Sequence, residues 1–126
     1  YLSAGDVLFS TVGATALCSI YDGRIPSVIA QNLVGLRFID EDQSFMYYML
    51  SEAHNNHKFK RIEMGAVQPS VKVSQMINIR FLVPNLLEQI EISRLLSVFD
   101  KKIALLADGT EQLNIFKKGL LQQMFV

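Results

Sequence analysis

The sequence predicts an α+β fold in which a small mixed β-sheet is followed by one long C-terminal helix of the coiled-coil type. Short runs of β-branched and aromatic residues, separated by turn residues, fill the part before Pro84. From Pro84 onward, apolar residues recur about every seven positions, which is typical of a helix that packs along another helix. The predicted domains are therefore residues 1–83, which contain the sheet, and residues 84–126, which form the helix.

The first part of the chain is expected to form short strands. Val7–Val12 and Ala16–Tyr21 are expected to pair as a hairpin, because a glycine-containing turn separates them. The dipeptide Asp22-Gly23 marks the next turn. Two further strands are expected at Arg24–Ala30 and Leu33–Ile39.

A helix is expected to follow these strands, beginning at the acidic residues Asp40–Asp42. Its apolar face at helical spacing consists of Met46, Met49, Leu50 and Ala53. The polar run His54–His57 is expected to end it. A single turn at Ser74–Asn78 and a last strand at Ile79–Val83 then lead to the long helix.

The long helix has a marked start and one weak point. Pro84 precedes Asn85, whose side chain suits an N-cap, and Glu88 stands at the capping-box spacing. The weak point is Ala107-Asp108-Gly109-Thr110. Glycine inside a helix costs about 1 kcal/mol relative to alanine, and Thr110 could cap a second helix. We expect one continuous helix, and two helices joined by a hairpin at Asp108-Gly109 are the alternative.

The apolar stripe of this helix is expected to face a partner. It consists of Ile92, Leu95, Phe99, Ile103, Leu106, Leu113, Phe116 and Leu120. An unbroken helix over this segment reaches roughly 60 Å, so the part before it is too small to cover the whole stripe. The stripe is also wider than a two-stranded seam, which suits a helix with a partner on each side.

Composition narrows the class of protein. Hydrophobic residues make up 50% of the chain, which is typical of a globular protein rather than a disordered one. The 12 basic and 12 acidic residues cancel, which argues against nucleic-acid binding over the whole surface and leaves a local patch possible. The single cysteine, Cys18, cannot form an intrachain disulfide and fits a reducing, cytoplasmic setting. No apolar run has the length of a membrane span.

The residues offer little for catalysis. The sequence contains neither a glycine-rich phosphate loop nor a dinucleotide-binding motif, and it has no paired cysteines. His54 and His57 supply only two metal ligands, whereas zinc sites use three or four. We therefore expect no catalytic residues, no metal and no cofactor.

Polar recognition chemistry is concentrated in one region. Lys58, Lys60 and Arg61 form the densest positive charge and can hold phosphates. If the following segment is extended, the alternating residues Gln68, Ser70 and Lys72 point to one face, where amide and ammonium groups suit base edges. The alternative to a DNA-binding surface is a solvated charged loop, which residue type alone favours.

Several stretches together resemble the specificity subunit of type I restriction-modification enzymes. Three of them are Gly5 to Ser10, Gly65 to Ser70 and Val83 to Ile90, the last containing Pro-Asn-Leu-Leu-Glu-Gln. The downstream spacing adds Leu95-Leu96, Phe99-Asp100, Ile103, Leu113, Lys117-Lys118-Gly119-Leu120-Leu121 and Phe125. The order from Pro84 to Phe125 is the most specific part, and the resemblance covers nearly the whole chain.

The resemblance implies a subunit that recognises a DNA sequence, directs methylation and restriction subunits to it, and has no enzymatic activity of its own. A full subunit has two target-recognition domains, each followed by a long helix, and the two helices pack antiparallel. This chain has room for the later part of one recognition domain, residues 1–83, and one spacer or dimerisation helix, residues 84–126. The missing half is expected from a second copy of the chain or from the rest of a full subunit.

The expected partners are double-stranded DNA, the methylation and restriction subunits, and the equivalent helix. On the resemblance, Lys58, Lys60, Arg61 and Lys72 are expected to face DNA, with Gln68 and Ser70 as candidate base readers. The alternative function is a coiled-coil interaction module that binds protein and not DNA.

Overall fold

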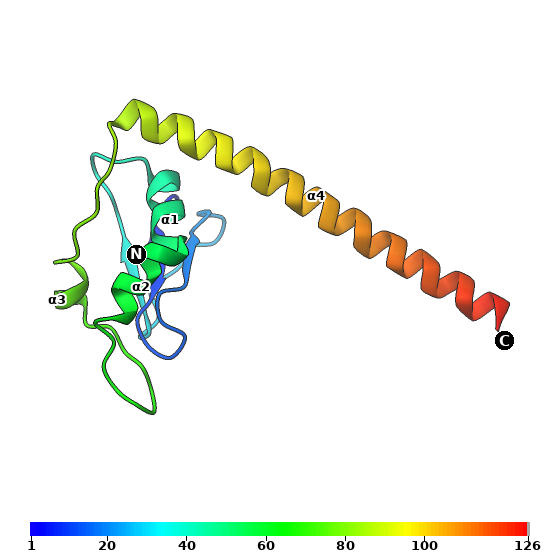
Figure 1. The fold of residues 1–126 in the computed structure, drawn as a ribbon, viewed down its shortest axis with the longest axis horizontal. Coiled ribbons are helices and arrows are strands. Elements are labelled where there is room, and N and C mark those ends of the chain that lie inside the picture. The colour runs from blue at the N-terminus through cyan, green and yellow to red at the C-terminus, as the bar shows by residue number, and fades with distance from the viewer. Residues whose placement is uncertain (126) are drawn as a thin grey trace. The chain divides into compact units, whose positions relative to one another are not determined.

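The computed structural model describes residues 1–125, and the side chains of Ala53, His54 and Asn56 lie outside the described set. Two compact units are present, Tyr1–Ser93 and Arg94–Val126. The elements in chain order are β1 (Val7–Ser10), β2 (Cys18–Ile20), β3 (Leu33–Leu36), α1 (Gln43–Ser51), α2 (Ala53–Lys60), α3 (Val73–Met76) and α4 (Leu86–Met124) (Figure 1). The start of α4, through Ser93, belongs to the first unit.

The first unit is built on a three-stranded sheet with the order β2-β1-β3. Both neighbours pair antiparallel with the central strand, with Leu8 opposite Ser19 on one side and Gly35 on the other. Along β1, Val7 and Phe9 are fully buried while Leu8 is half-buried, as the two-residue period of a strand requires. The sheet therefore has one face turned to the core.

Helices cover that face of the sheet (Figure 1). Contacts join α1 to β1, β2 and α2. In the core, the rings of Phe9 and Phe59 lie 4.7 Å apart, and those of Phe59 and Phe81 lie 5.8 Å apart. The buried cluster consists of Val7, Phe9, Ala16, Leu50, Phe59, Val71 and Met76. Residues from both ends of the first unit thus share one core.

Side-chain caps set the bounds of α1 and α2. The carboxylate of Asp42 accepts a hydrogen bond from the backbone N–H of Phe45 at 2.7 Å, which confirms the expected helix start in the acidic run. Glu52 has extended backbone angles, φ −65° and ψ 135°, and its carboxylate accepts from the N–H of Asn55 at 3.0 Å. Glu52 therefore ends α1 and begins α2.

The predicted fold class, a small sheet followed by a long helix, is confirmed, but several local predictions are wrong. The sheet is antiparallel at both pairings rather than mixed. The run His54–His57, expected to end a helix, lies inside α2 instead. Arg24–Ala30 is not a strand, and Pro26 within it has no N–H to donate to a ladder. Ile79–Val83 is not a strand either, and Phe81 from this segment packs on Phe59 instead.

A bidentate ion pair fixes the start of the sheet. The guanidinium of Arg37 donates to both carboxylate oxygens of Asp6, from Nε at 2.8 Å and from one Nη at 2.7 Å. The backbone N–H of Ser3 donates to the same carboxylate at 2.7 Å. The hydrogen bond from Arg37, then that from Ser3, lowers the pKa of Asp6 from 3.8 to about 2.

This lowered pKa predicts an acid-sensitive contribution to stability. Because the folded state favours ionised Asp6, the contribution is present above pH 3.8 and is lost as the pH falls toward about 2. We expect Asp6→Asn to flatten the pH dependence of the free energy of unfolding in that window, measured by urea titration. Asp22→Asn, which removes an exposed ion pair with Arg24, is the matched control, and an equal flattening in both variants would contradict the assignment.

The second unit is helical up to Met124, where α4 (Leu86–Met124) ends. α4 runs without a break from Leu86 to Met124, so the continuous helix is confirmed and the hairpin at Asp108-Gly109 is not formed. Asn85 caps the helix as predicted, since its side-chain oxygen accepts from the N–H of Glu88 at 3.1 Å. No described helix is both long enough and apolar enough to cross a membrane.

The apolar stripe of α4 is exposed over most of its length. Leu106 and Leu113 keep 72% and 69% of their surface accessible, and Phe116 keeps 65%. Other stripe members that are exposed are Leu95, Phe99, Ile103 and Leu120, while Ile92 is half-buried within the first unit. Large apolar surface of this kind is typical of an interface.

Candidate nucleic-acid interface

The segment from Met64 to Ser70, called here the 64–70 loop, closes on itself through its backbone. Met64 N–H donates to Ser70 O, and Ser70 N–H donates to Met64 O, both at 2.8 Å. Gly65 has φ +98°, and a Cβ at this position would lie 2.7 Å from the carbonyl oxygen of Gln68. Glycine is therefore required for the tight return of this loop.

The base of the 64–70 loop is fastened to the sheet. Val71 N–H donates to Thr11 O at 2.8 Å, and Gly13 N–H donates to Pro69 O at 2.9 Å. The hydroxyl of Thr15 donates to the carboxylate of Glu63 just before the loop. The loop thus starts from a fixed base beside the turn between β1 and β2.

Positive charge surrounds the base of this loop. Lys58 and Lys60 lie in α2 and Arg61 is its C-cap, where cations are favoured by the partial negative charge of the helix C-terminus. Lys72 is the N-cap residue of α3, on the other side of the loop. Lys60, Arg61 and Lys72 are exposed, and no ion pair holds any of them among the residues that the structure describes.

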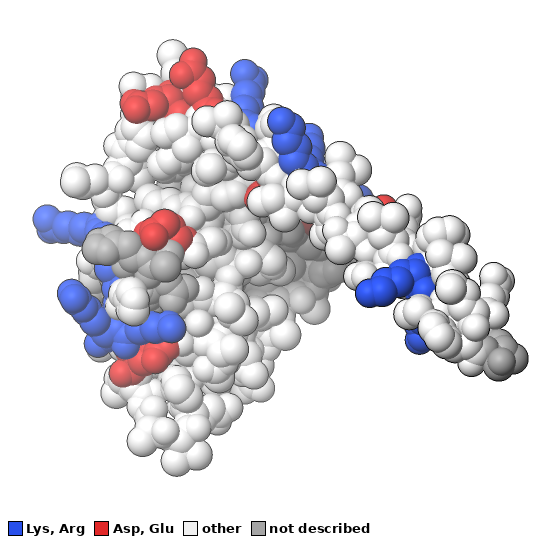
Figure 2. Space-filling view, turned by 45° about the vertical axis from the view of Figure 1, so that its right-hand side comes forward, with Lys and Arg blue, Asp and Glu red and all other residues white. Residues whose placement is uncertain are grey.

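Lys58 differs from the other cations. It is half-buried, with its Nζ 4.7 Å from the ring centroid of Phe81. A cation–π contact of this kind holds the ammonium group against the core without neutralising it. In the space-filling view, several Lys and Arg side chains gather at one edge of the first unit, with Asp and Glu side chains among them (Figure 2).

The two predicted base readers occupy different environments. Gln68 lies exposed in the bend of the loop, so the extended conformation expected from Gln68 to Lys72 is not formed at Gln68. Ser70 is half-buried, and its hydroxyl donates to the carbonyl of Met64 at 3.3 Å. Gln68 therefore offers its amide to a ligand, whereas Ser70 helps to close the loop.

One further cation was missed by the sequence reasoning. Arg80 is exposed and follows α3, next to Phe81, whose ring packs on α2. The only sequence signal was a single basic residue in an apolar run, which indicated a strand rather than a charged surface. Phe81, the residue after Arg80, contacts Phe59 and Lys58 of α2.

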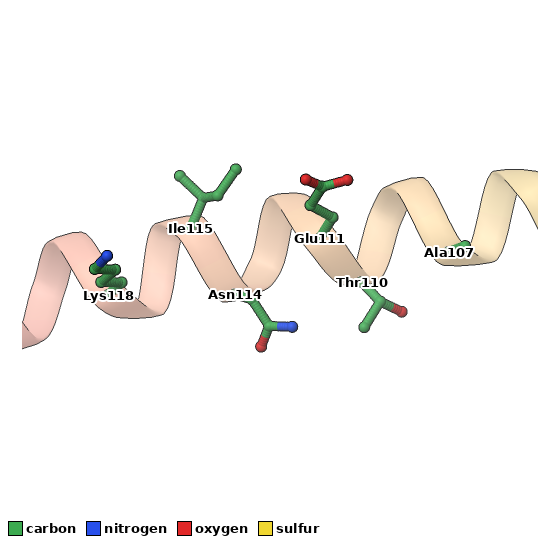
Figure 3. A pocket seen from close by; sticks show the side chains of 6 residues that line it. All are labelled: Ala107, Thr110, Glu111, Asn114, Ile115 and Lys118. Carbon is green, nitrogen blue, oxygen red and sulfur yellow. The ribbon is translucent and has the colours of Figure 1, made fainter.

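Neither of two pockets among the described residues has the lining expected of a catalytic or metal site. One, of about 250 Å³, is lined by side chains that are all apolar: Leu36, Phe38, Met46, Leu50, Phe59, Met76, Ile77, Ile79 and Phe81. The other is a shallow groove between turns of α4, and all its lining residues come from that one helix (Figure 3). The described residues contain no group of three metal-ligating side chains, and the side chain of His54 lies outside that set.

Comparisons with known proteins identify the family of this chain. The family described as type I restriction modification DNA specificity domain matches residues 1–114. The chain is 30% identical to a Methanocaldococcus jannaschii protein described as a type I restriction enzyme MjaX specificity subunit, over 98% of this chain and 31% of that protein. It is 24% identical to the type I restriction enzyme MjaVIII specificity subunit of the same organism, over 76% of this chain and 23% of that protein.

A solved structure shares the fold. The type I restriction-modification system S subunit from M. genitalium matches with a TM-score of 0.67 at 20% sequence identity, over 86% of this chain and 29% of that chain. This chain therefore spans about a third or less of the length of the proteins that it matches. Since the family match extends over most of the sequence, the chain belongs to the family of type I restriction-modification DNA specificity domains.

Proposed function

We propose that this chain recognises a specific DNA sequence as part of the specificity subunit of a cytoplasmic type I restriction-modification system. The observation that carries the proposal is the family match over residues 1–114, which includes the 64–70 loop and most of α4. Residues 1–83 serve as part of a target-recognition domain, and residues 84–126 serve as the spacer or dimerisation helix. The chain directs methylation and restriction subunits to DNA and leaves the chemistry to them.

The DNA-facing surface is the 64–70 loop together with the cations at its base. Lys60, Arg61 and Lys72 are exposed on both sides of the loop and are suited to phosphate oxygens. Lys58 adds charge from its position over Phe81. Gln68, exposed in the bend, supplies a paired donor and acceptor for a base edge.

The exposed stripe of α4 is the surface for an equivalent helix. That helix belongs to a second copy of the chain or to the other half of a full subunit, and the family implies that it runs antiparallel. Leu105 and Ile115 are also exposed, at 73% and 65%, and they lie off the stripe. They give α4 apolar surface for a second partner, for which we propose the methylation subunit.

DNA binding is tested by removing two cations from the base of the loop. In the complex with its methylation subunit, Lys60→Ala with Arg61→Ala is expected to weaken binding of all duplex sequences about tenfold at moderate salt. The slope of log affinity against log salt is expected to become shallower by about 0.9 for each phosphate group that the variant no longer neutralises. Fluorescence anisotropy of a labelled duplex over a salt series measures both quantities.

The control removes the same charge elsewhere on the chain. Lys101→Ala with Lys118→Ala changes two exposed cations of α4 and is expected to leave the affinity and the salt slope unchanged. If the loop-base variant binds like the unmodified chain, the cations do not contact phosphate. If the unmodified complex shows no affinity for DNA, the chain is an interaction module that binds protein alone.

A further inference from the structure

The tip of the 64–70 loop carries an apolar side chain that the fold does not use. Val67 is 99% exposed, and its neighbours Ala66 and Gln68 are exposed too. A fully exposed valine contributes nothing to the core and places an apolar group in water. The side chain is therefore available for a ligand at the surface where Gln68 is also displayed.

The backbone on both sides of Val67 is held in place. Met64 and Ser70 pair through two hydrogen bonds of 2.8 Å, and Gly65 makes the turn that no other residue fits. The carbonyl oxygen of Pro69 accepts from Gly13 N–H at 2.9 Å, which ties the returning side of the loop to the turn between β1 and β2. Because the base of the loop is already held, only the short tip remains to be ordered on a ligand, which lowers the entropy cost of binding.

The ligand class follows from the charges beside the loop and rests on the proposed DNA binding. Arg61 and Lys72 flank the loop in the chain. On the proposed function both contact phosphates, and a tip between two phosphate contacts then faces a groove of the duplex. The apolar group that a base pair offers there is the C5-methyl of thymine in the major groove. Wedges that open base steps in the minor groove are usually bulkier side chains such as phenylalanine or leucine, which valine does not match.

We propose that Val67 is a specificity-determining residue that contacts a thymine methyl group in the major groove. The 64–70 loop then selects an A·T pair at one position of the target, with Gln68 beside it. This contact adds sequence preference to a surface whose cations bind every sequence alike.

The test uses a base change that removes the methyl group and leaves base pairing intact. A target duplex is first selected from a random pool by the complex with its methylation subunit, and each thymine is then replaced in turn by uracil. At one position the unmodified complex is expected to bind about fourfold more weakly, the effect of losing one buried methyl-sized group. With Val67→Ala, the same replacement is expected to have a much smaller effect on affinity, because the shorter side chain loses the γ-methyl groups that reach the thymine methyl.

A control variant and separate outcomes distinguish failure of the thymine contact from failure of DNA recognition. Val28→Ala changes a valine that is 70% exposed in another part of the first unit, and it is expected to retain the sensitivity to uracil. If the complex selects no sequence, the proposed function itself fails. Suppose that the complex selects a sequence but no uracil replacement weakens binding. The thymine contact is then overturned, while DNA recognition stands. The same conclusion follows if Val67→Ala retains the full uracil effect. Equal weakening of thymine and uracil duplexes by Val67→Ala indicates a wedge and also overturns it.

Discussion

Replacing Leu106 and Leu113 with aspartate is expected to separate the chain from its partner helix and leave the first unit folded. Both leucines lie on the exposed stripe of α4, at 72% and 69% exposure, and neither belongs to the buried core. Burying a leucine fully is worth about 1.5–3 kcal/mol, and an aspartate in an apolar interface adds the cost of an unpaired charge. The dissociation constant is expected to rise by about a hundredfold or more.

Sedimentation velocity over a concentration series measures this change. The control, Ala104→Asp with Asn114→Asp, adds the same charge to exposed positions of α4 that lie off the stripe. It is expected to associate like the unmodified chain, while circular dichroism confirms that α4 stays helical in each variant. A chain that sediments as a monomer at the highest concentration, before any substitution, would rule out self-association through the stripe.

The long helix was predictable because many weak signals agree along one stretch. The seven-residue period, the cap at Asn85 and the early Glu88 all favour the same helix, and the structure has its start at Leu86. Only the stretch Asp108-Gly109-Thr110 argued for a break. With a continuous hydrogen-bonded helix on both sides, the cost of one glycine, about 1 kcal/mol, is too small to interrupt it.

The strands were less predictable because a strand depends on a neighbour that local sequence does not specify. Val7–Ser10 and Cys18–Ile20 pair as expected, since a short turn brings them together. Ile79–Val83 has the same residue types but is not a strand. Within it Phe81 packs on Phe59 while Leu82 is fully exposed, so residue type alone did not supply a neighbouring strand. The break at Glu52 was also missed, because a glutamate that ends one helix and caps the next has no distinctive sequence signal.

The sequence predicted which residues belong to the candidate site, but not how their side chains contact one another. The charge density identified Lys60 and Arg61, and the alternation from Gln68 identified Lys72; all three are exposed. The sequence did not indicate that Lys58 packs on Phe81 or that Ser70 closes the loop on Met64. These contacts join segments through the tertiary fold, which composition and spacing do not describe.

Gln89 shows how a motif residue can act through the fold. It appeared in the sequence only as part of the Glu-Gln pair after Pro84, yet it is the most deeply buried polar side chain described, at 0% exposure. Its Oε1 accepts from Asp42 N–H at 3.0 Å, and its Nε2 donates to Pro84 O at 2.8 Å. The same amide nitrogen donates to the carboxylate of Glu41. One side chain thus joins the start of α4 to the loop before α1.

Gln89→Leu is expected to destabilise the first unit by about 3 kcal/mol or more. Leucine fills similar space but leaves Asp42 N–H, Pro84 O and the Glu41 carboxylate without the partner that the fully buried amide of Gln89 gives them. These three residues are half-buried, and a polar group left unsatisfied away from water costs about 1–3 kcal/mol. Urea unfolding followed by circular dichroism, with the slope compared between variants, measures the loss. The control Gln75→Leu makes the same change at an exposed position of α3 and is expected to shift stability by about 0.5 kcal/mol or less. If Gln89→Leu unfolds at the same urea concentration as Gln75→Leu, the buried amide is not what holds the first turns of α4 to the unit. Those turns would then depend on apolar packing alone.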